Sequence, residues 1–287
     1  MFSFLQALFL YPYSFLGKKL LAAGGNSGNV LYDFFIGREL NPRIGYLDLK
    51  YFNELRPGLL HWGLYNFAFA YKQSQLPTSG GLPDPWMVLV IVFEGYYILD
   101  AVMNEPAILT TMDITTDGFG WMLSFGVLAW VPALYSLQSR YLSSKHSPIT
   151  TPLDILYFIL VVALGITGMI IFRGSNSQKD TYKRDPNHPS VKSLPTIPTP
   201  AGTKPLLVGG WWGKARHINY LGDWLMSISW SLPTGFSTPL PYFYPAYFAV
   251  LLVHRDMRDE EKCAQKYGKA WEEYCRRVKY RIIPFLY

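Results

Sequence analysis

Seven apolar segments restrict this chain more than any other feature of its sequence. They cover residues 2–16, 57–71, 86–103, 119–137, 152–172, 218–232 and 239–254. A helix needs about 20 residues to cross a bilayer, and the segments 86–103, 119–137 and 152–172 are long enough. Only 16% of the residues are charged, whereas soluble domains carry about 25%. The sequence therefore predicts an all-α, polytopic bundle of transmembrane helices that forms one membrane-embedded domain over residues 1–287.

Lysine and arginine are distributed unevenly between the connecting segments. If the N-terminus lies outside, the segments 17–56, 104–118, 173–217 and the tail from 255 face the cytosol and hold 23 of the 26 basic residues. This asymmetry follows the positive-inside rule. It accounts for the net charge of +6 without a nucleic-acid partner. The first apolar segment has no basic region before it, which predicts an uncleaved anchor rather than a signal peptide.

The segment 104–118 is the exception to this pattern. It has no basic residue but contains Glu105, Asp113 and Asp117, with Asp100 just before it. Acids beside membrane spans are costly and often functional. A short solvated loop is the alternative interpretation.

The last apolar segment leads into a charged helix at the predicted cytosolic face. Arg255, Asp259, Cys263 and Tyr267 follow at intervals of four residues, which places them on one helix face. Gly268 is expected to end this helix. Cys263 and Cys275 would lie about three helical turns apart, too far for a disulfide, which fits a reducing compartment.

A second basic pair lies in the long polar segment 173–204. We expect a short helical turn there, followed by an extended loop. Lys179 and Lys183 are four apart, so a helical turn would project both toward one phosphate, with Arg184 as a third cation. A positive-inside loop explains the charge equally well, but it does not explain the spacing.

A glycine- and tryptophan-rich run, Gly209-Gly210-Trp211-Trp212-Gly213, follows this segment. It is not a dinucleotide fingerprint, because no strand precedes it. Its glycines would let the backbone approach a ligand, and its indoles would stack on a flat ring. An aromatic belt at the membrane interface is the alternative. The sequence has no set of residues at metal-ligand spacing and no nucleophile motif, so these residues predict a cytosolic pocket for a phosphate-bearing ligand.

Several longer motifs resemble the sterol reductase family. They cover residues 28–43 (with Phe34-Phe35-Ile36-Gly37-Arg38-Glu39), 50–58, 109–120 (with Thr110-Thr111-Met112-Asp113), 211–220 and 254–284. Within that family the chain is most similar to the sterol C14 reductases and to the reductase domain of the lamin B receptor.

The resemblance implies reduction of the C14=C15 double bond of a sterol by NADPH during sterol biosynthesis. The expected location is the endoplasmic reticulum membrane, with the nuclear envelope as an alternative. An acid would protonate C15, and hydride would then add to the cation at C14. The cofactor pocket would lie in the half 173–287. Its matching positions are Lys179, Lys183, Leu207, Trp212, Asn219, Tyr220, Arg255, Asp259, Cys263 and Tyr267. The candidates for proton donor or cation stabiliser are Tyr97, Asp100, Glu105, Asp113 and Asp117.

The chain departs from the family pattern in two places. The family has about ten transmembrane helices, so the seven segments here imply that N-terminal helices are missing. Val127 also replaces an aspartate near the expected sterol pocket. An inactive truncated paralogue or a membrane scaffold therefore stays as an alternative. So does a membrane methyltransferase of the isoprenylcysteine type, whose cofactor, S-adenosylmethionine, has no phosphate and would leave the Lys179/Lys183 pair idle.

Overall fold

The chain folds into helices that form two compact units. The structure is a computed structural model and describes residues 1–109 and 111–287. Unit 1 covers Met1–Pro148 and unit 2 covers Ile149–Tyr287. The all-α prediction is confirmed, and the only strands among the described residues are two short antiparallel hairpins. Thr110, which belongs to one of the motifs above, lies outside the described residues.

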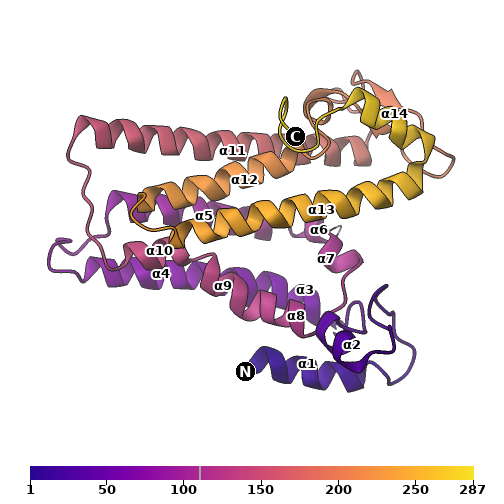
Figure 1. The fold of residues 1–287 in the computed structure, drawn as a ribbon, viewed down its shortest axis with the longest axis horizontal. Coiled ribbons are helices and arrows are strands. Elements are labelled where there is room, and N and C mark those ends of the chain that lie inside the picture. The colour runs from indigo at the N-terminus through magenta and orange to yellow at the C-terminus, as the bar shows by residue number, and fades with distance from the viewer. Residues whose placement is uncertain (110) are drawn as a thin grey trace. The chain divides into compact units, whose positions relative to one another are not determined.

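Unit 1 consists of short helices around two longer ones (Figure 1). Three of the predicted apolar segments in this unit correspond to α1, α4 and α5, and the fourth is divided between the four helical pieces from Trp121 to Leu142. The elements in order are α1 (Phe2–Tyr13), α2 (Val30–Ile36), β1 (Arg43–Ile44), β2 (Leu47–Asp48), α3 (Leu49–Asn53), the π-helical turn η1 (Glu54–Leu59), α4 (Leu60–Ser74), α5 (Pro85–Met103), α6 (Glu105–Ile108), α7 (Met112–Thr115), α8 (Trp121–Phe125), the π-helical turn η2 (Gly126–Trp130), α9 (Val131–Leu134) and α10 (Leu137–Leu142).

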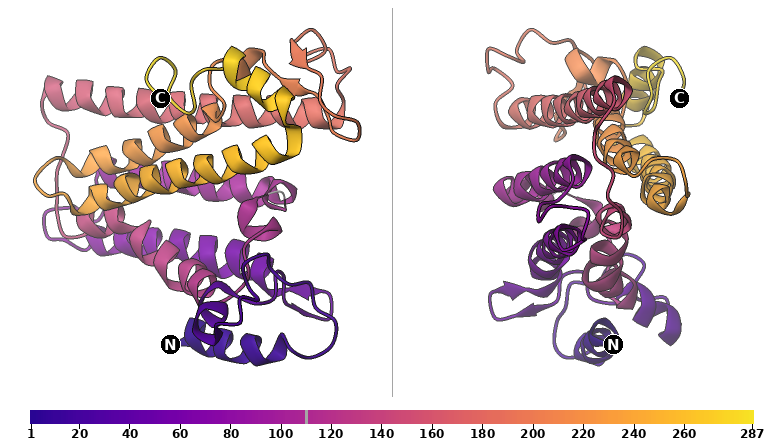
Figure 2. Two further views of the ribbon diagram at one scale, coloured as in Figure 1. Left: turned by 45° about the vertical axis from the view of Figure 1, so that its right-hand side comes forward. Right: turned by 90° about the vertical axis from the view of Figure 1, so that its left-hand side faces the viewer.

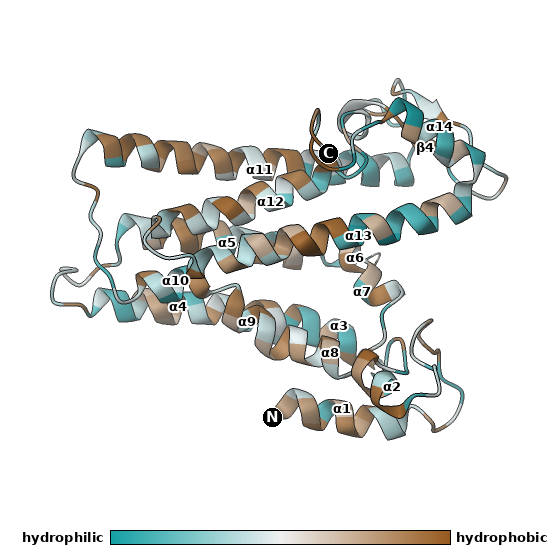
Figure 3. Ribbon diagram, in the orientation of Figure 1, coloured by the Kyte–Doolittle hydropathy of each residue, from teal (hydrophilic) through white to brown (hydrophobic). Residues whose placement is uncertain are grey.

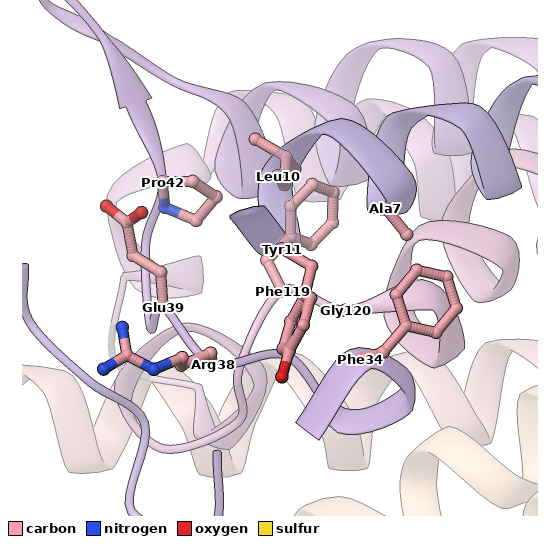
Figure 4. A pocket seen from close by; sticks show the side chains of 10 residues that line it. Ala7, Leu10, Tyr11, Phe34, Arg38, Glu39, Pro42, Phe119 and Gly120 are labelled. Atoms are coloured by element: carbon pink, nitrogen blue, oxygen red, sulfur yellow. The ribbon is translucent and has the colours of Figure 1, made fainter. Parts of the chain in front are cut away.

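Two of the sequence motifs meet through glycines in unit 1. A Cβ atom on Gly37 would lie 2.1 Å from the nitrogen of Gly120, and one on Gly118 would lie 1.9 Å from the oxygen of Gly37. The Phe119 nitrogen also donates to the carbonyl of Glu39 at 3.0 Å. The crevice beside this contact encloses only about 10 Å³ (Figure 4), which is room for about one water. At this contact the three glycines therefore serve close backbone packing.

Unit 2 is built on one long helix, α11 (Pro152–Arg184), of 33 residues. Pro152 occupies its first turn, and Thr151 and Asp154 form a reciprocal capping box at its start. The elements that follow are β3 (Thr196–Ile197), β4 (Leu206–Leu207), the 3₁₀ turn η3 (Gly210–Gly213), α12 (Ile218–Ser231), the 3₁₀ turns η4 (Leu232–Thr234) and η5 (Leu240–Tyr242), α13 (Phe243–Tyr267) and α14 (Lys269–Arg277). Figure 2 shows α11, α12 and α13 from two further sides.

The predicted extended loop over 173–204 is partly wrong. Residues 173–184 continue α11 as three further helical turns. Polar side chains carry the helix beyond its apolar part because the 3₁₀ turn η3 packs against them. Figure 3 shows how hydropathy changes along α11 and α13. Each helix has a hydrophobic part and becomes hydrophilic toward its C-terminus.

Three stretches of helix are long and apolar enough to cross a membrane among the described residues. They are Pro85–Met103, Trp121–Leu142 and Pro152–Arg184. They overlap the three predicted segments 86–103, 119–137 and 152–172, which were long enough to cross a bilayer. The other four apolar segments also form helices, namely α1, α4, α12 and α13, but none of them meets both criteria.

Helices α11 and α12 approach closely through a pair of glycines. A Cβ atom on Gly222 would lie 2.5 Å from the nitrogen of Phe172 and 2.8 Å from the oxygen of Gly168. Both are backbone atoms, so a methyl group could fit only if the helices moved apart.

We expect Gly222→Ala to destabilise unit 2 by about 1–3 kcal/mol, the usual cost of overpacking. Gly95→Ala is the matched control, because Gly95 also lies within a helix but a Cβ atom there meets nothing within 4 Å. Thermal unfolding in detergent would measure both variants. Equal melting temperatures for the two would contradict the close-packing argument.

Candidate functional site

The polar stripe predicted in the tail lies on one helix. Arg255, Asp259, Cys263 and Tyr267 all belong to α13, and each is half-buried. The helix ends at Tyr267, and Gly268 follows with a φ of +53°, a conformation that favours glycine. Cys263 and Tyr267 pack against the buried aromatic cluster of Trp271 and its neighbours. The predicted spacing and helix end are therefore confirmed.

The C-terminal end of α11 presents two exposed lysines. Lys179 and Lys183 are one helical turn apart, and the Lys179 ammonium lies 4.0 Å from the ring centroid of Trp212. Arg184, the predicted third cation, forms an exposed ion pair with Asp180 at 3.1 Å. Lys204, which the sequence analysis missed, instead donates to the carbonyl of Lys183. No local pattern indicated it, because it lies 21 residues farther along the chain.

Trp212 is buried at the base of this basic end. Its indole nitrogen donates to the carbonyl of Ser175 at 2.8 Å, and its ring shares a cluster with Leu207, Tyr182 and Val191. Leu207 is buried in the same cluster. Two of the predicted positions thus form the apolar wall beneath Lys179.

The glycines around Trp212 have a different role from the one predicted. A Cβ atom on Gly210 would lie 2.3 Å from the Gln178 amide, and one on Gly209 would lie 2.5 Å from the ring of Pro195. The Gln178 side chain accepts from the nitrogen of Trp211 at 2.9 Å. The lack of a side chain at Gly209 and Gly210 therefore leaves room for Pro195 and Gln178, and these contacts hold η3 against α11.

Asn219 and Tyr220 connect α11 to α13. The Asn219 amide nitrogen donates to the side chain of Asn176 at 3.3 Å, and the Tyr220 hydroxyl donates to Asp259 at 3.4 Å. The Asn219 carbonyl oxygen is buried and has no hydrogen-bond partner among residues 1–109 and 111–287. A buried acceptor of this kind is usually satisfied, so it is open to a donor from a ligand.

Charge interactions bring the two halves of the predicted site together. Burial raises the pKa of the Cys263 thiol to about 11, and the neighbouring Asp259 raises it as well. The charge of Lys179 acts on the same thiol in the opposite direction. Lys179 of α11 is thus an electrostatic neighbour of the α13 stripe, and Cys263 is a neutral thiol at physiological pH.

A buried ionic network underlies this site. Asp256 of α13 is fully buried and accepts from the Arg281 guanidinium at 2.6 Å, with the His217 ring 3.3 Å away. His217 stacks on Tyr220 with centroids 4.7 Å apart. Burial and the positive charge of Lys179 lower the pKa of His217 to about 3, so the ring is neutral. No sequence pattern indicated this role of His217, because its partner Asp256 lies 39 residues farther along the chain.

The residues of unit 2 fit a phosphorylated, ring-bearing cofactor. Two exposed lysines suit phosphate, the half-buried Tyr220 supplies aromatic surface, and the Asn219 oxygen needs a donor. Among the described residues, no group of three or more metal-ligating side chains occurs.

The candidate proton donors all lie in unit 1, but in different surroundings. The Tyr97 ring packs 5.9 Å from the ring of Trp62, and Asp100 accepts from Asn104 at 3.2 Å. Glu105 forms an ion pair with Arg56 at 3.2 Å. Asp113 and Asp117 lie half-buried at the two ends of one turn. Tyr97, Asp100 and Glu105 thus contact different residues, whereas Asp113 and Asp117 belong to the same turn.

A recess of about 420 Å³ opens beside Glu105 in unit 1. Its wall includes Arg43, Tyr51, Phe52 and Arg56. Ligand sites commonly measure about 300–1,000 Å³. Glu105 is the only one of the five candidates in the described lining of this recess.

Glu94 is a buried acid that the sequence analysis did not select. Its side chain is 0% exposed, and one carboxyl oxygen accepts from the Trp62 indole at 2.7 Å and from the Asn66 amide. Its position inside the apolar segment 86–103 was a usable signal, because ionisable residues in membrane spans are seldom incidental. Glu94 joins α4 to α5.

We expect Glu94→Ala to destabilise unit 1 by about 2–4 kcal/mol, because Trp62 and Asn66 would lose their acceptor in a buried site. Glu94→Gln should cost much less, since its amide oxygen can accept from both groups. Detergent melting curves would test the pair. An alanine variant as stable as the glutamine variant would contradict this role.

Comparison with known proteins places these observations in a family. A family model described as the ergosterol biosynthesis ERG4/ERG24 family matches residues 1–287. The chain belongs to this family. The delta(14)-sterol reductase erg24 of Schizosaccharomyces pombe is 56% identical over 286 residues, which cover 100% of this chain and 66% of that protein. The delta(14)-sterol reductase TM7SF2 of Mus musculus is 53% identical over 286 residues, which cover 99% of this chain and 66% of that protein.

A third member of the ERG4/ERG24 family differs more in length. The delta(14)-sterol reductase LBR of Gallus gallus is 51% identical over 283 residues, which cover 98% of this chain and 44% of that protein. The chain spans just under two thirds of the length of the first two relatives. The resemblance to the sterol reductase family is thus confirmed.

Val127, the departure noted in the ERG4/ERG24 pattern, is buried in unit 1. It is 7% exposed and packs in a cluster with Leu10 and Phe119. The chain thus holds an apolar side chain where the family resemblance implies a carboxylate.

Proposed function

We propose that this chain is the cofactor-binding and proton-donating part of an NADPH-dependent delta-14-sterol reductase. It would reduce the C14=C15 double bond of a sterol intermediate in sterol biosynthesis, within the membrane of the endoplasmic reticulum. The observation that carries the proposal is the convergence of Lys179, Trp212 and the Asp259–Cys263 face of α13 in a chain of the ERG4/ERG24 family.

In this proposal the basic end of α11 binds the cofactor phosphates. Lys179 and Lys183 supply exposed ammonium groups, and the contact with the Trp212 ring holds the Lys179 ammonium in position. Asn219 offers its unpaired oxygen as an acceptor. Arg255, Asp259, Cys263 and Tyr267 line the opposite wall. The cofactor, when bound, supplies a hydride.

The proton would come from the acids of unit 1. An isolated alkene does not accept hydride, so C15 must be protonated first, which leaves a tertiary cation at C14. Tyr97, Asp100, Glu105, Asp113 and Asp117 are the candidates for donating the proton or for stabilising the cation electrostatically. The sterol is the expected ligand of the recess beside Glu105, whose size suits a small molecule.

Complementation of a cell that lacks C14 reductase would test the proposal. We expect expression of this 287-residue chain to remove the Δ14 sterols that such a cell accumulates. Persistent Δ14 sterols despite membrane expression, with NADPH still bound, would support the second candidate, an inactive paralogue or scaffold, which the buried Val127 favours. Loss of both binding and conversion would reject the proposed cofactor site itself.

A further inference from the structure

Lys50 is a fully buried lysine whose ammonium is enclosed by backbone oxygens. Its side chain is 0% exposed. The ammonium donates to the carbonyls of Asp113 at 2.6 Å, Ile114 at 3.1 Å and Asp117 at 2.8 Å. An ammonium has three protons, so each proton has one of these oxygens. These bonds join segments that are 63 to 67 residues apart in the sequence.

The oxygens that bind Lys50 belong to the turn that carries two of the candidate acids. Helix α7 covers only Met112–Thr115, which is too short to be stable without tertiary contacts. Asn41 adds one bond to the same turn, from its amide nitrogen to the carbonyl of Ile114 at 3.2 Å. The direction of the Asp113 and Asp117 side chains therefore depends on the hydrogen bonds from Lys50 to the backbone of this turn.

Four acidic groups act electrostatically on the ammonium: Asp48 of β2, Glu54 of η1, and Asp113 and Asp117 of the turn. Burial lowers the pKa of Lys50 to about 8, although these four carboxylates act in the opposite direction. The group is thus charged at neutral pH and loses its charge in mildly alkaline solution.

We propose that Lys50 is a positioning residue for proton donation, because its ammonium fixes the turn from Asp113 to Asp117. This inference rests on the proposed reductase function. A neutral amine has two protons and a lone pair, so it would repel one of the three carbonyls. The turn would then be held by fewer bonds, and the reaction would slow as Lys50 loses its proton.

Deprotonation of Lys50 should reduce activity without unfolding the protein. Between about pH 8 and the ordinary lysine pKa of 10.5, the unfolded chain binds more protons at this residue than the folded chain does. The contribution of Lys50 to the free energy of unfolding therefore rises with pH in this window. An alkaline loss of rate at constant or rising stability would separate positioning from general denaturation.

The experiment compares the rate of Δ14 reduction from pH 6 to pH 10 in the wild type, Lys50→Met and Asn41→Ala. For Lys50→Met we expect a rate about 10- to 100-fold lower at pH 7, the scale of charge-assisted hydrogen bonds, and no alkaline limb near pH 8. Its NADPH affinity should stay within about twofold, because the proposed cofactor residues lie in the other unit. Asn41→Ala removes one neutral bond to the same turn and should keep the alkaline limb.

A Lys50→Met protein that binds NADPH and keeps the wild-type rate and pH profile would overturn the inference. Absence of Δ14 reduction in the wild type would instead reject the proposed function. If Lys50→Met fails to fold, the wild-type alkaline limb can be measured at several temperatures. Ammonium groups ionise with a large enthalpy, so its midpoint should fall on warming, whereas an unchanged midpoint would rule out Lys50.

Discussion

The double variant Lys179→Ala/Lys183→Ala should bind NADPH about 100-fold or more weakly than the wild type. The variant lacks two charge-assisted hydrogen bonds to phosphate, each worth about 1.5–3 kcal/mol. A difference of about 1.4 kcal/mol corresponds to a tenfold change in the dissociation constant. Binding of NADH, which lacks the additional phosphate, should weaken less. Titration of the purified protein in detergent with both nucleotides would measure the difference.

Lys192→Ala is the matched control for this pair. Lys192 is an exposed lysine of the same unit and the same polar segment, so it tests general electrostatic attraction. It should change NADPH affinity by less than about twofold. Equal affinities of the double variant for NADPH and NADH, both unchanged from the wild type, would reject the cofactor assignment.

Asp256→Ala should be the most destabilising single change in unit 2, at about 3–5 kcal/mol, the cost of breaking a buried ion pair. Asp256 is fully buried, and its loss leaves the Arg281 guanidinium without its 2.6 Å partner. The segment after α14 would then be held mainly by the backbone nitrogens of Arg216 and His217, which donate to the carbonyls of Tyr280 and Arg281 at 2.9 and 2.7 Å. Thermal unfolding in detergent would measure the loss.

Glu273→Ala provides the contrast for Asp256→Ala. Glu273 pairs with Arg277 at 2.8 Å on the exposed surface of α14, where the side chains are 31% and 54% exposed. Exposed pairs contribute about 0–1 kcal/mol. If both variants melted at the same temperature, the Asp256 network would have no special role in stability.

The apolar segments predicted most of the fold, because each of them is apolar enough to form a helix that packs in the protein or faces lipid. The continuation of α11 beyond Phe172 could not be predicted in this way. Its last turns are polar, and they are held by contacts to η3 such as the bond between Gln178 and Trp211. The division at residues 148 and 149 also has no signal in the sequence, since a Pro-containing loop there resembles the other connections.

The candidate site was predictable where its residues follow helical spacing. The α13 stripe and the Lys179/Lys183 pair both depend on the four-residue interval, and the structure places each pair or stripe on one helix. Lys50 and Lys204 could not be identified, because their contacts are with backbone carbonyls far along the chain. In the sequence, Lys50 is one of many basic residues in the predicted cytosolic segments. Only its hydrogen bonds to three backbone carbonyls distinguish it from the others.

The length of α11 has a consequence for how the bilayer acts on this protein. Its 33 residues measure about 50 Å at 1.5 Å per residue, whereas the hydrocarbon layer is about 30 Å thick. A bilayer that holds the apolar part of α11 would therefore leave Lys179 and Lys183 outside the hydrocarbon layer on the same helix. Lipid of a different thickness that tilts α11 would also change the height of these two charges, so we expect membrane composition to alter the proposed nucleotide affinity.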